Sequence, residues 1–164
     1  MKEIISFLRR LQCNNNREWF NAHKEEFLKH QARFHELVEE VIKEIATFDS
    51  DVANLTPKDC TYRIYRDVRF SSDKSPYKCH FGAFITKGGK KSGYSGYYFH
   101  ISTGGGEEYP YCHMLAAGDY CCEPKVLKIL GLLVKIVHKI GAVFVYWSKL
   151  VHKCGYLLAF STCI

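Results

Sequence analysis

The chain has 164 residues, of which 47% are hydrophobic, 24% charged and 15% aromatic. This composition is typical of a globular domain with a substantial core, and it excludes a disordered or fibrous chain. The net charge is +6, and it is concentrated in residues 58–91, which hold nine of the 23 Lys and Arg but three of the 17 Asp and Glu. A concentrated basic stretch attracts anions, although it is also compatible with an ordinary solvated surface.

The N-terminus lacks the uninterrupted apolar run of a signal peptide, because Glu3, Arg9 and Arg10 fall within it. We therefore expect a cytoplasmic protein whose eight cysteines are reduced, packed thiols rather than a disulfide framework. We also expect no metal, since Cys112-His113 and Cys121-Cys122 lack the spacing of a structural zinc site. No Walker, GxGxxG, GxSxG or HExxH motif occurs, so no cofactor is expected.

Helical periodicity is clearest in the first fifty residues. Residues 3–11 form an amphipathic pattern with one apolar face, made of Ile4, Phe7, Leu8 and Leu11. The triplet Asn14-Asn15-Asn16 follows, and we expect it to end this helix and to begin the next. The second helix should run over 17–48, with an apolar stripe that recurs every seven residues at Phe20, Phe27, Phe34, Val41 and Phe48.

Strand character begins at residue 61, after a loop over 49–59. Side chains of 61–70 alternate between two faces, as they do in a β-strand. One of these faces is unusually polar, since it carries Arg63, Tyr65, Asp67 and Arg69. Arginines on a half-buried strand need anionic partners, which either the protein or a ligand has to supply.

The next segment predicts a β-hairpin. Residues 71–78 should form a loop, because Pro76 and the surrounding Ser and Asp residues break strand pairing. Residues 79–86 and 94–102 are then predicted to be two strands, joined by a basic, glycine-rich loop. Residues 103–118 are glycine-rich as well, and we expect them to be irregular.

A helix is expected to start near Lys125, because Pro124 is a favourable first helical residue. Residues 126–164 contain no acidic side chain, and lysines interrupt their apolar runs well short of the about 18 residues of a membrane span. A basic amphipathic segment can also lie on an anionic bilayer surface. We favour a buried C-terminal helical segment with a lysine edge, and expect neither a transmembrane segment nor membrane-surface contact.

These elements predict an α+β fold for residues 1–164, organised as a single domain. In it, the long N-terminal amphipathic helix packs its phenylalanine stripe on an antiparallel β-sheet built from residues 61–102. The C-terminal helical segment completes the predicted fold.

The basic side chains of the central stretch form a candidate anion-binding site. Arginine forks bind phosphate or carboxylate through paired hydrogen bonds, and Tyr and His add directional ones. The alternative is a structural network, in which Asp67 and Asp73, with glutamates from the long helix, neutralise the arginines. The candidate ligand-binding residues are Arg63, Arg66, Arg69, Lys74, Tyr77 and Lys78.

Two other kinds of activity remain open. Basic residues interleaved with tyrosines also suit single-stranded nucleic acid, through stacking and phosphate contacts, but no ribonucleoprotein signature is present. For catalysis, His80 or His100 is a weak candidate for a general acid or base beside Asp67, since a strand histidine is more often structural. Whether the protein is an enzyme is left open.

Four sequence blocks follow one another along the chain: NNNREWF at 14–20, YRIYRDVRFSSDKSPYKCHFGAFI at 62–85, GGKKSGYSGYYFHI at 88–101 and AGDYCCEPKVLK at 117–128. In order and spacing they resemble domain of unknown function 2461, a family of uncharacterised intracellular proteins from bacteria and fungi. The resemblance reaches about Lys128 and implies a single α+β domain with no established catalytic residues. Members of that family have a polar, charged C-terminal third, so the apolar and basic residues 129–164 are expected to be an atypical tail from a truncated or frame-shifted reading frame.

From these features we expect a protein that binds a small anionic ligand, bearing phosphate or carboxylate, on a basic and aromatic face of the sheet. The alternative is a noncatalytic module that binds nucleic acid or a protein, with its arginines held in a structural Arg/Asp/Glu network.

Overall fold

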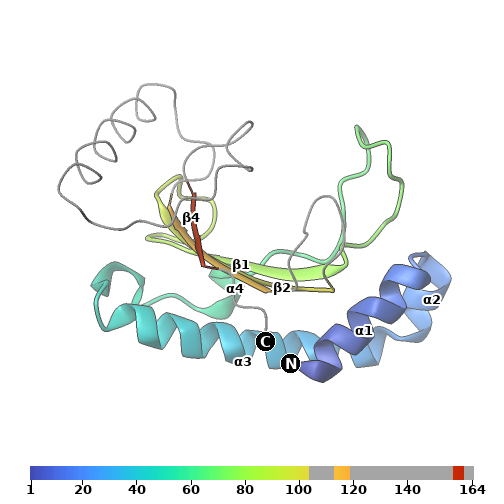
Figure 1. Ribbon diagram of the computed structural model, residues 1–164, viewed down its shortest axis with the longest axis horizontal. Helices are drawn as coiled ribbons and strands as arrows, with labels where there is room; N and C mark the ends of the chain where they lie inside the picture. Colours follow the sequence, from blue (N-terminus) through green and yellow to red (C-terminus); the bar gives the residue numbers. More distant parts are fainter. Residues whose placement is uncertain (104–112, 119–156, 161–164) are drawn as a thin grey trace.

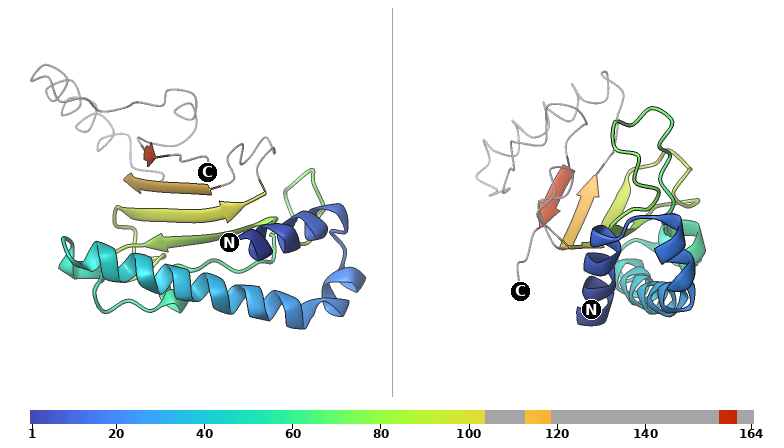
Figure 2. Two further views of the ribbon diagram at one scale, coloured as in Figure 1. Left: turned by 60° about the horizontal axis from the view of Figure 1, so that its bottom comes forward. Right: turned by 90° about the vertical axis from the view of Figure 1, so that its right-hand side faces the viewer.

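The computed structural model describes residues 1–103, 113–118 and 157–160. Its helices lie on one side of an antiparallel sheet with strand order β1-β2-β3-β4 (Figures 1 and 2). The predicted α+β class is therefore confirmed. The elements are α1 (Lys2–Cys13), α2 (Arg17–Ala22), α3 (Lys24–Ala46), the 3-10 turn η1 (Ser50–Val52), α4 (Pro57–Cys60), β1 (His80–Ile85), β2 (Gly96–Ser102), β3 (His113–Gly118) and β4 (Leu157–Phe160).

The core forms where the apolar faces of α1 and α3 meet the sheet. The four apolar residues predicted for the first helix are all buried in α1. Phe34 of α3 lies at the centre, with its ring stacked on Phe81 of β1 at 5.2 Å and on Phe99 of β2 at 5.7 Å between centroids. Aromatic rings bury large apolar areas, so this stack joins α3 firmly to the first two strands.

The second predicted helix differs from the structure in two ways. It is divided at His23, whose imidazole Nδ1 lies 2.8 Å from the Trp19 carbonyl oxygen and whose ring stacks on Trp19 at 4.0 Å. The backbone of His23 (φ −111°, ψ 19°) leaves the α-helical region there, which ends α2 and begins α3. In addition α3 ends at Ala46, so Phe48 lies beyond the helix and is 70% exposed instead of completing the stripe.

The segment 61–70, predicted to be a strand, is irregular. It touches its neighbours through two isolated bridges, Thr61 to Ala83 and Tyr65 to Tyr77. The second bridge falls in the loop before β1, where Pro76 accepts a hydrogen bond but has no N–H to donate. Regular pairing therefore stops, and 61–70 forms no strand. The preceding residues 49–59, predicted to be a loop, contain η1 and α4.

The predicted hairpin is confirmed as β1 and β2, which pair from Ile85↔Tyr97 to His80↔Ser102. Alternate side chains of these strands face the helices, while the others point to the opposite face, which we call the outer face. Residues 113–118, predicted to be irregular, form β3. The predicted helix near Lys125 and the lysine edge of the tail lie outside the described residues.

None of the described helices combines the length and the apolar character that a membrane span needs. Over the same described ranges, no three His, Cys, Asp or Glu side chains gather as metal ligands.

Candidate functional site

Two of the candidate arginines pair with aspartates of their own segment. Arg69 donates to Asp67 through Nε at 2.9 Å and through Nη2 at 2.7 Å. Arg66 pairs with Asp73, which also accepts hydrogen bonds from the backbone N–H and the hydroxyl of Ser75. The hydrogen bonds from Arg69 lower the pKa of Asp67 to about 2, and those from Ser75 and Arg66 lower the pKa of Asp73 to about 2. Both aspartates are therefore ionised partners at neutral pH.

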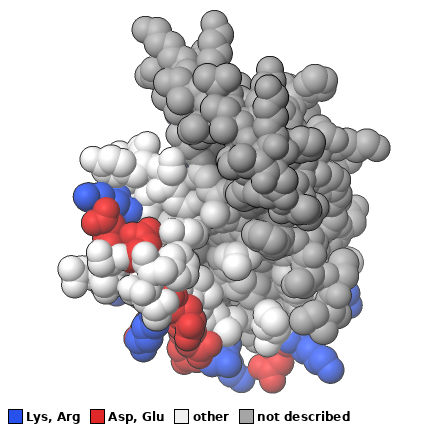
Figure 3. All heavy atoms as spheres, turned by 60° about the vertical axis from the view of Figure 1, so that its left-hand side comes forward, with Lys and Arg blue, Asp and Glu red and all other residues white. Residues whose placement is uncertain are grey.

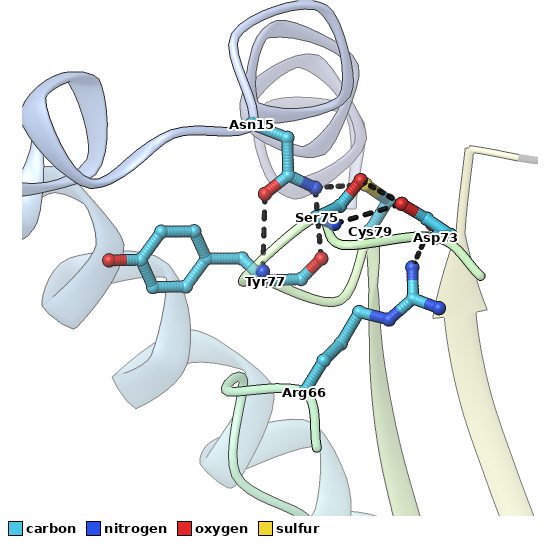
Figure 4. A network of polar contacts seen from close by, with 6 residues as sticks. All are labelled: Asn15, Arg66, Asp73, Ser75, Tyr77 and Cys79. Atoms are coloured by element: carbon cyan, nitrogen blue, oxygen red, sulfur yellow. Dashed lines mark hydrogen bonds and ion pairs between the residues drawn. The ribbon is translucent and has the colours of Figure 1, made fainter. Parts of the chain in front are cut away.

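A single side chain, Asn15, fastens the end of this loop to the helices. Its Nδ2 donates to the Tyr77 carbonyl oxygen at 2.9 Å, and its Oδ1 accepts from the Tyr77 N–H at 3.1 Å (Figure 4). The same Nδ2 lies 3.6 Å from the Cys79 sulfur. The amide thus pairs with Tyr77 as a neighbouring strand would. Sequence reasoning gave the Asn triplet only a capping role, which Asn16 fulfils by accepting from the Trp19 N–H at 2.9 Å.

Tyr77 belongs to the core by its packing. Its side chain is 4% exposed, and its ring stacks on Phe20 with 3.9 Å between centroids. In Figure 4 its hydroxyl points away from the pair formed by Arg66 and Asp73. On the next residue, the Lys78 N–H donates to the Ile64 carbonyl oxygen at 2.8 Å. The buried Tyr77 and this hydrogen bond together fix the backbone at Lys78.

Aromatic and imidazole rings gather on the outer face of the sheet. The rings of His80 and His100 lie 6.0 Å apart, and Tyr98 contacts His100 edge-on at 5.5 Å. Gly82 of β1 lies beside these rings. A Cβ atom at Gly82 would come within 3.1 Å of the Tyr98 hydroxyl and 3.7 Å of the Tyr62 ring. The absence of a side chain at Gly82 lets both tyrosines lie over the strand. We call Tyr62, Lys78, His80, Tyr98 and His100 the outer-face cluster.

The cluster carries positive charge at one corner. The Lys78 ammonium lies 5.6 Å from the centroid of the Tyr62 ring. Burial, together with the nearby His100, Lys78 and Arg66, lowers the pKa of His80 to about 3. The unfolded chain takes up this proton near pH 6.5 and the folded protein only near pH 3, so His80 makes the fold less stable as the pH falls through that window.

The remaining candidates lie in the loop or around it. Lys74 donates to the Val68 carbonyl oxygen at 3.0 Å. Arg63 is exposed, makes no hydrogen bond or ion pair with the described residues, and is near enough to contribute to the low pKa of Asp67. The structure therefore brings His80 and His100 together, but it pairs Asp67 with Arg69. The catalytic and ligand-binding assignments stay predictions.

Charge elsewhere on the described surface is mixed. Figure 3 shows basic and acidic side chains next to one another rather than a field of one sign. On α3, Arg33 pairs with Glu36 at 2.6 Å and Lys43 pairs with Glu39 at 2.8 Å. Exposed pairs of this kind contribute little to stability and mark an ordinary solvated face.

The comparisons agree with the resemblance seen in the sequence. Comparison with curated proteins and with solved structures finds no match. A family model described as conserved hypothetical protein DUF2461 matches residues 3–130, which include the helices α1–α4, the loop at 66–75, the outer-face cluster and the strands β1–β3. On this match, the chain belongs to the DUF2461 family.

Proposed function

We propose that the protein binds a small anionic ligand, bearing phosphate or carboxylate, at the corner of the outer face where Lys78 meets His80. The observation that carries the proposal is that Arg66 and Lys78 lie on two segments joined by backbone hydrogen bonds, from the Arg66 N–H to the Pro76 carbonyl oxygen and from the Lys78 N–H to the Ile64 carbonyl oxygen. Both cations are near enough to His80 to contribute, after burial and His100, to its low pKa. An anion placed there interacts favourably with both charges.

The local structure supports such a site because its groups are held in place before a ligand arrives. The Lys78 backbone is fixed between Tyr77, which Asn15 binds on both its N–H and its carbonyl oxygen, and the partly buried Cys79. The guanidinium of Arg66 is oriented by Asp73. Groups that are already ordered lose little conformational entropy on binding, which raises affinity.

The other candidate residues take different parts in this proposal. Arg69 is engaged by both oxygens of Asp67, and Lys74 by the Val68 carbonyl oxygen, so each supplies positive charge near the loop rather than a direct contact. Tyr77 positions Lys78 through the backbone. Tyr62 and Tyr98 border the site, with hydroxyl groups suited to donate to an anionic oxygen.

Inorganic phosphate is expected to raise the melting temperature of the wild-type protein. A ligand at ten times its Kd stabilises a protein by about 1.4 kcal/mol, or roughly 4 °C for a chain of this size. Lys78→Met keeps a long unbranched side chain at this position but removes the charge, and it should abolish most of this rise. The measurement is thermal unfolding by circular dichroism over a phosphate series at constant ionic strength.

Lys91→Met is the matched control, since Lys91 is an exposed lysine of the hairpin loop between β1 and β2. It should leave the phosphate effect unchanged. The proposal is wrong if neither phosphate, sulfate nor a nucleotide stabilises the wild-type protein, or if both lysine variants respond as the wild type does.

A further inference from the structure

The loop at residues 66–75 projects from the sheet on the side away from α3 (Figures 1 and 2). It presents an aromatic side chain to solvent. Phe70 is 96% exposed, more than any other large apolar residue in the described ranges. Its ring makes one described contact, with the Arg69 guanidinium 5.8 Å from the ring centroid. A single exposed apolar side chain is common on protein surfaces, but a ring on a projecting loop beside a guanidinium has an open face on which a planar group can stack.

The loop is braced from within, so the ring is presented in a defined place. The backbone N–H of Arg69 donates to Asp67 Oδ1 at 3.3 Å, in addition to the two side-chain bonds between these residues. Farther along, Asp73 Oδ1 accepts from the Ser75 N–H at 2.8 Å and from its hydroxyl at 2.5 Å. A braced loop loses less entropy when a partner binds than a flexible one does.

A second ring and two arginines belong to the same segment as Phe70. Tyr65 is 50% exposed, and its inner side rests against Tyr77 at 5.5 Å between centroids. Arg69 pairs with Asp67, and Arg63 is near enough to Asp67 to help to lower its pKa. Residues 62–75 hold four basic and two acidic side chains, so their formal charge favours an anionic partner.

We propose that this surface, formed by Arg63, Tyr65, Arg69 and Phe70, binds single-stranded nucleic acid. A base stacks on the open face of Phe70, a phosphate beside it contacts Arg63, and Arg69, which stays paired with Asp67, adds positive charge near the ring. Stacking on aromatic rings together with phosphate contacts is the usual mode of single-strand binding, and it needs no base-specific hydrogen bonds. The surface uses neither Lys78 nor His80, so it does not depend on the small-ligand site.

The charges near Phe70 favour a strand over a lipid surface. Asp67 and Asp73 are half exposed and stay ionised at neutral pH. A flat anionic bilayer would approach both carboxylates together with the cations and would be repelled by them. A flexible strand can place its phosphates at the guanidinium groups and its bases elsewhere. One exposed ring also supplies little apolar area for insertion into a membrane.

The test is fluorescence anisotropy of a labelled twelve-residue oligo-dT with the full-length protein at 50 and 200 mM salt. We expect the affinity to fall with salt, as it does when phosphates are neutralised. Phe70→Ala should weaken binding about tenfold, since stacking contributes about 1–3 kcal/mol per base. Phe70→Trp should retain binding. Phe48→Ala removes another exposed phenylalanine, beyond the end of α3, and should have no effect.

Three results would overturn the inference. The first is an affinity for oligo-dT that does not change with salt. The second is a Phe70→Ala variant that binds as tightly as Phe48→Ala, and the third is equal affinity for a duplex of the same length, whose bases cannot stack on the ring. Binding to phosphatidylserine vesicles through Phe70, with no binding to oligo-dT, would replace the strand by a bilayer as the partner.

Discussion

Gly96→Ala is expected to destabilise the protein by about 3 kcal/mol, a typical upper value for forcing an atom into a packed site. A Cβ atom at this first residue of β2 would lie 2.5 Å from the Ile85 carbonyl oxygen and 2.6 Å from the Thr86 Cβ. The backbone cannot yield easily there, because the Thr86 hydroxyl donates to the Ser95 carbonyl oxygen at 2.7 Å. The ends of β1 and β2 would have to separate, which weakens the hairpin that carries the outer-face cluster.

Urea denaturation monitored by circular dichroism measures this effect, and Gly93→Ala is its control. Gly93 has a positive φ of 80°, but a Cβ atom there would meet no atom within 4 Å. Only the strain of a left-handed backbone then acts, at about 1–2 kcal/mol. Equal losses of unfolding free energy for the two variants would show that the close approach at Gly96 is not the cause.

Asn15→Asp is expected to have a comparable effect, about 3 kcal/mol, because it disrupts both contacts with the Tyr77 backbone. The carboxylate can still accept from the Tyr77 N–H, but it cannot donate to the Tyr77 carbonyl oxygen, and it would place a negative charge beside that oxygen. A buried acceptor that loses its partner costs about 1–3 kcal/mol, and the repulsion adds to this. Thermal unfolding of the purified variant measures the loss.

Asn16→Asp provides a stringent comparison in the adjacent residue. Asn16 caps α2 through its side-chain oxygen, and Asp caps a helix about as well as Asn does. The two variants carry the same change of charge and side chain one residue apart. If Asn16→Asp destabilises the protein as much as Asn15→Asp, the pairing of Asn15 with Tyr77 does not carry the effect.

The helical half of the fold follows from local patterns. The apolar faces of α1 and α3 are visible in the sequence because a helix repeats every 3.6 residues, and Phe27 and Phe34 are buried where the stripe places them. The division at His23 could not be read in this way, since it depends on a contact of its imidazole with the Trp19 carbonyl oxygen and ring. Side-chain to backbone contacts of this kind leave no periodic signal.

The sheet and the site show the same division between local and long-range information. Alternation predicts β1 and β2, but the same alternation over 61–70 does not show that this segment pairs only through isolated bridges, one of them from Tyr65 to Tyr77 across the loop. The role of Asn15 joins residues 62 positions apart, and neither partner reveals the other in the sequence. The basic stretch is evident from composition, whereas its pairing of Arg69 with Asp67 and of Arg66 with Asp73 depends on the course of the loop.

The titration of His80 by proton NMR, with and without inorganic phosphate, tests most directly whether Lys78 and Arg66 converge on an anion site. His80→Gln identifies the resonance. In phosphate-free buffer the imidazole should remain neutral well below pH 6.5, because it is partly buried and close to both cations. Phosphate should raise its pKa, since an anion at the corner offsets the positive charge of Lys78 and Arg66. An ordinary pKa near 6.5 without phosphate, or a low pKa that phosphate leaves unchanged, would contradict the proposed site.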